Sequence, residues 1–155
     1  MLMGTIVSAA KDMILNTFNF KGRLARAGYW WARFFFIIIN FIILLIEFAA
    51  DTKFLSNLFT ILYFFPILSA TVRRFHDVGK SGLQVAVIYI GTFVFALVGT
   101  MFLLLFSFSV LDGNPSGSSL FAAAFFYLMM LGTEICELVV LCMKSDEDNQ
   151  YGPKA

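Results

Sequence analysis

Residues 83–110, LQVAVIYIGTFVFALVGTMFLLLFSFSV, form an uncharged and strongly apolar stretch that decides the fold class. The hydrocarbon core of a bilayer is about 30 Å thick, and a helix crosses it with about 20 residues at about 1.5 Å each. This stretch is longer than that requirement. It therefore predicts a transmembrane helix.

Three further apolar runs lie at residues 29–50, 56–72 and 120–143. The first and the last are long enough to cross a bilayer, and residues 56–72 are at the lower limit. The chain is 60% hydrophobic and 14% charged, whereas soluble domains are roughly 45–50% apolar and about 25% charged. We expect an all-α fold, in which residues 1–155 form a single domain with four transmembrane helices in one bundle.

The basic residues fall on alternate sides of these runs and indicate the orientation of the chain. Lys and Arg are enriched in cytoplasmic loops of membrane proteins. Ten of the eleven basic residues share one side if both termini are cytoplasmic, and Lys53 is the exception. Residues 112–119, between the third and fourth runs, contain no Lys or Arg. The pattern predicts a multi-pass protein with both termini in the cytoplasm.

The first 14 residues differ in character from the apolar runs. They lack the basic segment of a secretory signal, and Lys11 and Asp12 interrupt their apolar stretch. Their apolar residues recur at helical spacing, with polar residues largely at other positions. We expect a short amphipathic helix lying in the membrane interface. A frayed tail is the alternative.

A basic and aromatic cluster precedes the first run. It contains Arg23 and Arg26, and Tyr29 and Trp30 open the run itself. Cations attract anionic headgroups with about 1 kcal/mol per residue near the surface, and amphipathic rings favour the headgroup level. The cluster is typical of a surface that binds lipid or a partner, or of an anchor that only sets the topology.

Residues 72–82 are expected to form a compact loop between the second and third runs. This segment carries five ionisable residues, namely Arg73, Arg74, His76, Asp77 and Lys80. Asp77 could pair with any of the three cations. A metal site needs three or four ligands, and His76 is the single histidine of the chain. We expect no catalytic, cofactor or metal site here.

The chain ends in a polar tail with three consecutive acids, Asp146, Glu147 and Asp148. These acids would lie on the same side of the membrane as the arginines of the two basic clusters. Two interpretations are open. The tail is an electrostatic latch over this surface, or it is a solvated acidic tail.

Four ionisable residues fall within the predicted spans, where charges are costly and usually have partners. Glu47 lies close to the outer end of the first run, where its side chain can reach the headgroups. The other three lie further inside. Arg33 belongs to the first run, and Glu134 and Glu137 share one face of the last run. We predict that Arg33 lies near Glu137. Glu134 would be protonated or bonded to a polar group such as Asn40. The two glutamates either hold the bundle together or line a transport pathway.

Three motifs occur in order along the chain. They are Phe-x-Phe-x-Gly-Arg-x-x-Arg-x-x-Tyr-Trp at residues 18–30, Arg-Arg-x-His-Asp-x-Gly-x-Ser-Gly at 73–82, and Asn-x-Tyr-Gly-Pro at 149–153. Together they resemble the small bacterial inner-membrane proteins of the YhaH type, the domain of unknown function numbered eight hundred and five. The resemblance implies the bacterial inner membrane and one surface shared by the three motifs, and it brings no established activity. Leu83 departs from the family, which usually has Trp there.

The resulting functional hypothesis is a non-enzymatic integral inner-membrane protein whose cytoplasmic surface binds anionic lipid headgroups or a protein partner. The expected binding residues are Arg23, Arg26, Tyr29, Trp30, Arg73, Arg74, His76 and Asp77. The alternative is a small oligomeric transporter or channel that uses Glu134 and Glu137. A homo-oligomer is compatible with both hypotheses. No nucleic-acid partner is expected from a net charge of +1.

Overall fold

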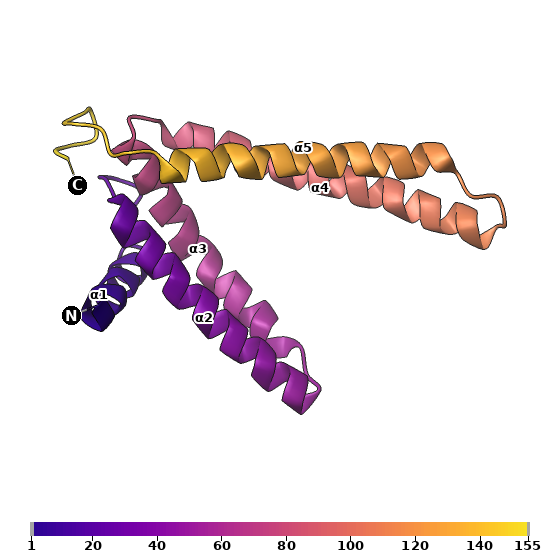
Figure 1. Cartoon of the computed structure of the whole chain (residues 1–155), viewed down its shortest axis with the longest axis horizontal. Helices are drawn as coiled ribbons and strands as arrows, with labels where there is room; N and C mark the ends of the chain where they lie inside the picture. The colour runs from indigo at the N-terminus through magenta and orange to yellow at the C-terminus, as the bar shows by residue number, and fades with distance from the viewer. Residues whose placement is uncertain (1, 155) are drawn as a thin grey trace. The chain divides into compact units, whose positions relative to one another are not determined.

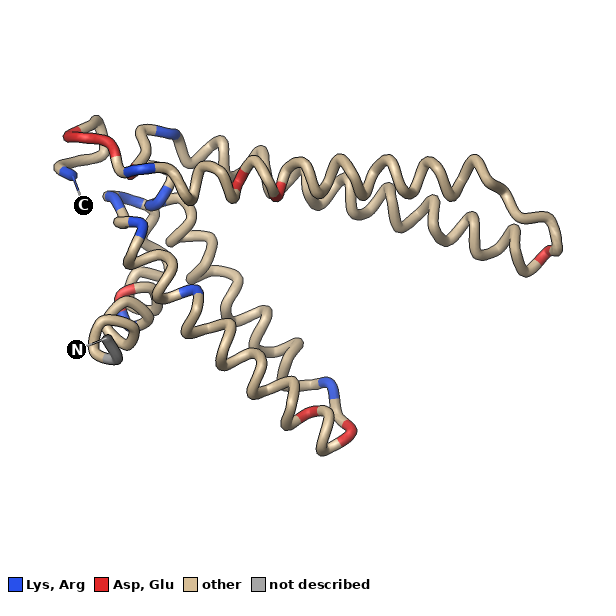
Figure 2. Tube along the Cα trace, in the orientation of Figure 1, with Lys and Arg blue, Asp and Glu red and all other residues tan. Residues whose placement is uncertain are grey.

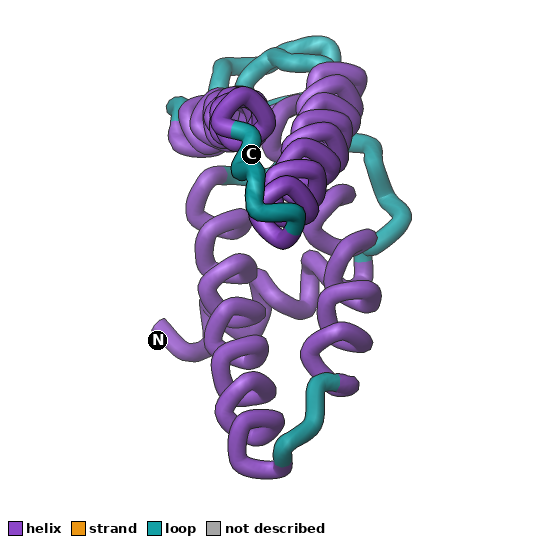
Figure 3. The backbone as a smooth tube through the Cα atoms, turned by 90° about the vertical axis from the view of Figure 1, so that its right-hand side faces the viewer, coloured by secondary structure: helices purple, strands orange, loops and turns teal. Residues whose placement is uncertain are grey.

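The computed structural model describes residues 2–154, which fold into helices and loops with no β-strand among them (Figures 1 and 3). The helices are α1 (Leu2–Leu15), α2 (Arg26–Ala50), α3 (Phe54–Asp77), α4 (Gly82–Leu111) and α5 (Gly117–Cys142). In this part of the chain, α2 to α5 are long and apolar enough to cross a membrane. The predicted all-α fold is confirmed, and each of the four helices contains most of one predicted run.

The chain divides into two compact units. Unit 1 consists of Met1–Gly82 with Leu141–Ala155, and unit 2 consists of Leu83–Val140. Unit 1 therefore holds α1 to α3 together with the tail that follows α5. The predicted packing of all four long helices into one bundle stays a prediction.

In unit 1, α2 and α3 run side by side in opposite directions, and α1 packs against both (Figure 1). The Glu47 carboxylate, buried near the end of α2, accepts the backbone N–H of Ser56 at 3.0 Å and so caps the first turn of α3. At the other end, the Ser69 hydroxyl donates to the carbonyl oxygens of Asn16 and Asn19, at 2.6 and 3.0 Å. These bonds attach the segment that follows α1 to the side of α3.

The helix α3 continues beyond its apolar run through Arg73 to Asp77. The expectation that residues 72–82 form a loop was therefore wrong for residues 72–77, which belong to α3. Charged side chains that form ion pairs do not by themselves end a helix. The helix ends in a Schellman motif: Gly79 N–H donates to His76 at 3.1 Å, and Lys80 N–H to Phe75 at 2.9 Å. Gly79 adopts φ +70°, which favours glycine.

Unit 2 is a hairpin of α4 and α5. Hydroxyl pairs join the two helices along their length: Thr92 with Thr133 at 2.7 Å between Oγ1 atoms, and Thr100 with Tyr127 at 3.0 Å. Such bonds, together with close van der Waals packing, hold helices together where lipid removes the usual hydrophobic driving force.

Candidate functional site

Lys and Arg of unit 1 concentrate at the end where α2 begins and α3 ends, and the tail lies at the same end (Figure 2). At the centre is a group of three charged side chains, Arg23, Arg74 and Asp77, which we call the arginine–aspartate cluster. Arg23 Nη2 lies 3.0 Å from Asp77 Oδ1, and their side chains are 2% and 0% exposed. Arg74 Nη1 pairs with the other oxygen, Oδ2, and is equally buried. One carboxylate therefore compensates two buried guanidinium groups.

The remaining acceptors for Arg23 are the Asp77 carbonyl oxygen, 3.2 Å from Nη2, and three backbone carbonyl oxygens of the tail. Its Nη1 donates to Glu147 at 2.8 Å and to Gly152 at 2.9 Å, and its Nη2 donates to Asp146 at 2.6 Å. The guanidinium of Arg23 thus joins the segment before α2, the end of α3 and the tail. This contact closes the tail over the cluster.

The second guanidinium, that of Arg74, binds where α5 ends. Its Nε donates to the Leu141 carbonyl at 3.2 Å, and its Nη2 donates to the Met143 carbonyl. The last carbonyls of a helix have no intrahelical partners and carry the negative end of its dipole. Arg74 therefore caps the last residues of α5, and Ser145 adds a hydroxyl that donates to Asp77 Oδ2.

His76 connects the three motifs directly. Its ring stacks on Tyr151, with centroids 3.8 Å apart and planes 5° apart. Its Nδ1 lies 3.2 Å from the Gly22 carbonyl oxygen, and its own carbonyl accepts from Asn149 Nδ2 at 2.9 Å. Every motif singled out in the sequence contributes a residue to this contact. The expectation that the three motifs lie together is confirmed, and a binding surface built from them stays a prediction.

The acidic side chains of the tail do not bind the arginines. Glu147 pairs with Lys154 at 2.8 Å, and Asp148 accepts the Lys154 backbone N–H at 3.0 Å. The hydrogen bond and charge of Lys154 lower the pKa of the exposed Glu147 carboxyl. The tail is held, as one interpretation expected, but by its carbonyl oxygens, the Asn149 amide and the Tyr151 ring, and not by its carboxylates.

Arg73 points away from the cluster, toward α1. Its Nη1 lies 3.1 Å from Asp12 Oδ2, a pairing that the sequence did not indicate. Its Nε and Nη2 are buried and have no hydrogen-bond partner among the described residues. Positive charge at this end of unit 1 is therefore only partly compensated. Arg26 is exposed and makes one long contact, 3.4 Å from Nη1 to the Cys142 carbonyl.

The aromatic residues at the start of α2 are packed inside unit 1. Tyr29 is fully buried, and its hydroxyl lies 3.3 Å from Thr71 Oγ1 and accepts from Arg33 Nη1 at 2.6 Å. Trp30 is half-buried and packs edge-on against the Tyr29 ring. Tyr29 thus supports the helix pair from within.

The intramembrane charges lie in different units. Arg33 belongs to unit 1, and Glu134 and Glu137 belong to unit 2. Within unit 2, Glu137 is buried and accepts from the Tyr89 hydroxyl at 3.4 Å, whereas Glu134 is exposed. The predicted proximity of Arg33 to Glu137 stays a prediction.

The ion pairs and hydrogen bonds of this site have a structural role, because they hold three chain segments together. Its carboxylate is saturated by two guanidinium groups and a hydroxyl, and its arginines are saturated by carbonyl oxygens. Within residues 2–154, no group of three or more His, Cys, Asp or Glu side chains is placed to hold a metal ion. The arrangement joins three chain segments, while Lys21 and Arg26 at the same end are exposed.

Comparison with known proteins identifies the family of the chain. Residues 17–153 match the family described as a protein of unknown function, DUF805. The chain belongs to the DUF805 family. The match includes every residue of the arginine–aspartate cluster and all the partners named for it.

The chain is also similar to two curated proteins, both named inner membrane protein YhaI, from Escherichia coli strain K12 and from Escherichia coli O157:H7. Each is 28% identical over 97 residues, which are 61% of this DUF805 chain and 78% of the relative. No solved structure shows significant similarity to the chain.

Proposed function

We propose that this DUF805 protein is a non-enzymatic, multi-pass protein of the bacterial inner membrane that binds anionic phospholipid on its cytoplasmic side. Both termini lie in the cytoplasm in this proposal. The orientation is supported by the charge pattern, because nearly all Lys and Arg residues share one side of the predicted spans. The location is supported by the similar YhaI proteins, which are named inner membrane proteins.

The observation that carries the proposal is an apolar groove of about 210 Å³ between α1 and α2. Five of its lining residues are apolar, and the sixth is the exposed Lys11; the lining consists of Val7, Ala10, Lys11, Ile14, Leu15 and Phe35. An acyl chain fits the apolar lining, and a phosphate fits the ammonium at its rim. In this arrangement α1 is the amphipathic helix of the interface.

Exposed cations at the same end of unit 1 complete the surface. Lys21 lies in the segment between α1 and α2, and Arg26 begins α2. The arginine–aspartate cluster acts differently from the sequence-based hypothesis: Arg23, Arg74 and Asp77 hold the surface in shape, and the exposed cations attract the headgroups.

Fluorescence of the two tryptophans, Trp30 and Trp31, tests this proposal. Brominated phosphatidylglycerol in nanodiscs is expected to quench them more strongly than brominated phosphatidylcholine, and high salt should weaken the preference. Each cation contributes about 1 kcal/mol near a lipid surface. A variant combining Lys11→Gln, Lys21→Gln and Arg26→Gln should therefore lose at least about tenfold in preference.

The matched control is Lys53→Gln, which removes a cation from the loop at the opposite end of the α2–α3 pair. It should leave the lipid preference unchanged. Equal quenching by the two brominated lipids in the unmodified protein would overturn the proposal. A protein that co-purifies in a Lys11-dependent manner, with no lipid preference, would assign the surface to a protein partner.

A second candidate function is transport along unit 2. The favouring observation is a row of polar contacts between α4 and α5: Tyr89 with Glu137, Thr92 with Thr133, and Thr100 with Tyr127. In this function the protein is an oligomer, because few helices enclose little space. Proton or ion flux into vesicles should then fall at least about tenfold in Glu137→Gln. Flux that is absent, or equal in Glu137→Gln and the loop control Asp112→Asn, would exclude it.

A further inference from the structure

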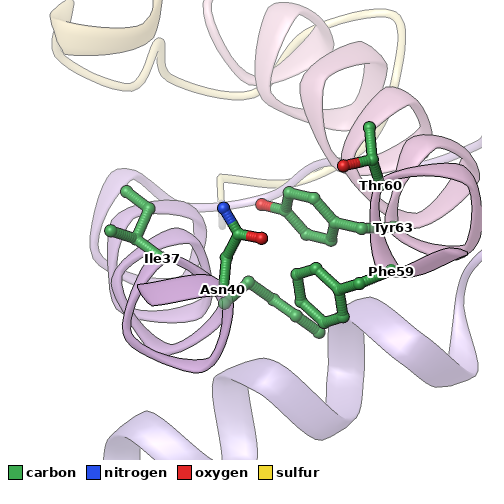
Figure 4. Close-up of a pocket in the computed structure, with 6 residues that line it drawn as sticks. Ile37, Asn40, Phe59, Thr60 and Tyr63 are labelled. Carbon is green, nitrogen blue, oxygen red and sulfur yellow. The ribbon is translucent and has the colours of Figure 1, made fainter. Parts of the chain in front are cut away.

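A cavity of about 140 Å³ lies between α2 and α3 (Figure 4), and no residue of the arginine–aspartate cluster lines it. Its lining comes from both helices and consists of Phe36, Ile37, Asn40, Phe59, Thr60 and Tyr63. Three of these residues are aromatic and pack on one another. The Phe36 and Tyr63 ring centroids are 4.6 Å apart, and the Phe59 and Tyr63 rings stack at 6.0 Å.

Two polar atoms in this cavity are buried without partners. Asn40 Oδ1 and the Tyr63 hydroxyl make no hydrogen bond to any part of the chain that the structure describes. Figure 4 shows the Asn40 amide and the Tyr63 hydroxyl directed toward one another from the two helices. Thr60 differs, because its hydroxyl donates to the Ser56 carbonyl at 2.8 Å.

An unpartnered buried polar group lowers stability, and bilayer hydrocarbon offers no water to replace the missing bond. Two such groups facing one space indicate a missing partner. Asn40 Oδ1 is an acceptor and requires a donor, whereas the Tyr63 hydroxyl can donate. One hydroxyl group satisfies both requirements, since its hydrogen binds Asn40 and its lone pair accepts from Tyr63.

The other residues that line the cavity indicate which kind of molecule carries this hydroxyl. The lining contains no charged side chain, so a neutral molecule fits. An engineered apolar cavity of about 150 Å³ holds one benzene molecule, which matches the volume here. Aromatic walls favour a ring that packs edge-on or offset against them. A water would satisfy the polar atoms alone and leave the apolar part empty.

We propose that this cavity is a binding site for a neutral, phenol-type molecule, with its ring among Phe36, Phe59 and Tyr63 and its hydroxyl between Asn40 and Tyr63. The molecule enters from the bilayer, because the site lies partway along two membrane-spanning helices. This site is independent of the lipid surface proposed above, since no residue is shared between them.

Fluorine NMR of the full-length protein in nanodiscs tests the proposal, with 4-fluorophenol as the probe and 4-fluorotoluene as its equally sized partner without the hydroxyl. We expect saturable binding of 4-fluorophenol at one site per chain. The 4-fluorotoluene probe should bind at least about tenfold more weakly, because it leaves both polar atoms unpaired. Asn40→Leu and Tyr63→Phe should each weaken 4-fluorophenol binding by about the same factor.

The control variant is Asn57→Leu, which replaces an exposed asparagine of α3 outside the cavity lining. It should bind 4-fluorophenol as the unmodified protein does. Probe-free thermal unfolding gives a second measurement: Asn40→Leu and Tyr63→Phe remove unpaired polar groups, so neither should lower the Tm. Non-saturable partitioning, equal binding of both probes, or binding unchanged in the two cavity variants would each overturn the proposal. A lowered Tm in both variants would also overturn it, because another group of the protein would then supply the missing partner.

Discussion

Replacing Asp77 with asparagine should lower the free energy of unfolding by about 3–5 kcal/mol. The Asp77 carboxylate is fully buried and is the counter-charge of both Arg23 and Arg74. Asparagine has the same shape but no charge, so two guanidinium groups would stay buried with carbonyl acceptors only. Breaking a buried ion pair by removing one partner is strongly destabilising for this reason. Unfolding of the purified protein in mild detergent, followed by circular dichroism, measures the loss.

The control for this variant is Asp112→Asn, which makes the same chemical change at an exposed position in the α4–α5 loop. Its effect should stay within about 0.5 kcal/mol. A double variant offers a further check: with Arg74→Met added to Asp77→Asn, only one buried guanidinium lacks a counter-charge, so stability should partly return. Equal unfolding curves for Asp77→Asn and Asp112→Asn would show that the cluster does not stabilise the fold.

Apolar runs located the long helices, but the second run did not locate the end of its helix. The second predicted run stopped at residue 72, because hydropathy falls where Arg73 and Arg74 begin. The helix continues to Asp77, since a helix ends where its backbone is capped, and the cap is the turn at Gly79. Hydropathy reports how favourably side chains transfer into lipid. The end of a helix depends instead on how its last backbone groups are hydrogen-bonded.

The sequence predicted part of the membership of the candidate site and left its pairing open, because Asp77 could pair with Arg73, Arg74 or Lys80. Charge distribution and motif order placed Arg23, Arg74 and Asp77 on one surface. The geometry then pairs Asp77 with Arg74, three residues before it, and with Arg23 from another segment. Arg73 is adjacent in sequence, but helical rotation directs it to Asp12 on α1. Only the packing of α1 decides that partner, and no local pattern encodes it.

The cavity between α2 and α3 is a second feature that the sequence alone did not predict. Asn40 was noticeable as a polar residue in an apolar run, whereas Tyr63 stands among phenylalanines and gave no signal. Their proximity depends on the register in which the consecutive helices α2 and α3 pack, and no local sequence pattern gives that register. A buried polar atom that lacks a hydrogen-bond partner can be identified only when the positions of all its neighbours are known.

Replacing Arg23 with lysine should release the tail. The guanidinium binds the Asp77 carboxylate and three tail carbonyls at once, which an ammonium with three donors on a flexible stem cannot reproduce. We expect the tail to open more easily by about 2 kcal/mol, because hydrogen bonds to charged groups are worth about 1.5–3 kcal/mol. Cleavage by chymotrypsin after Tyr151 should then be about 30 times faster, since proteolysis follows the open population. Mass spectrometry of the C-terminal fragment measures this rate.

Two controls separate the roles of the tail's backbone and side chains. Lys21→Gln removes an exposed cation two residues before Arg23 and should leave the cleavage rate unchanged. A variant combining Asp146→Asn, Glu147→Gln and Asp148→Asn removes all three tail carboxylates but keeps the carbonyl oxygens that Arg23 binds. It should also keep the tail closed, because none of these carboxylates contacts Arg23. Fast cleavage of the triple variant with slow cleavage of Arg23→Lys would instead mean that charge attraction between the acids and the surrounding cations holds the tail.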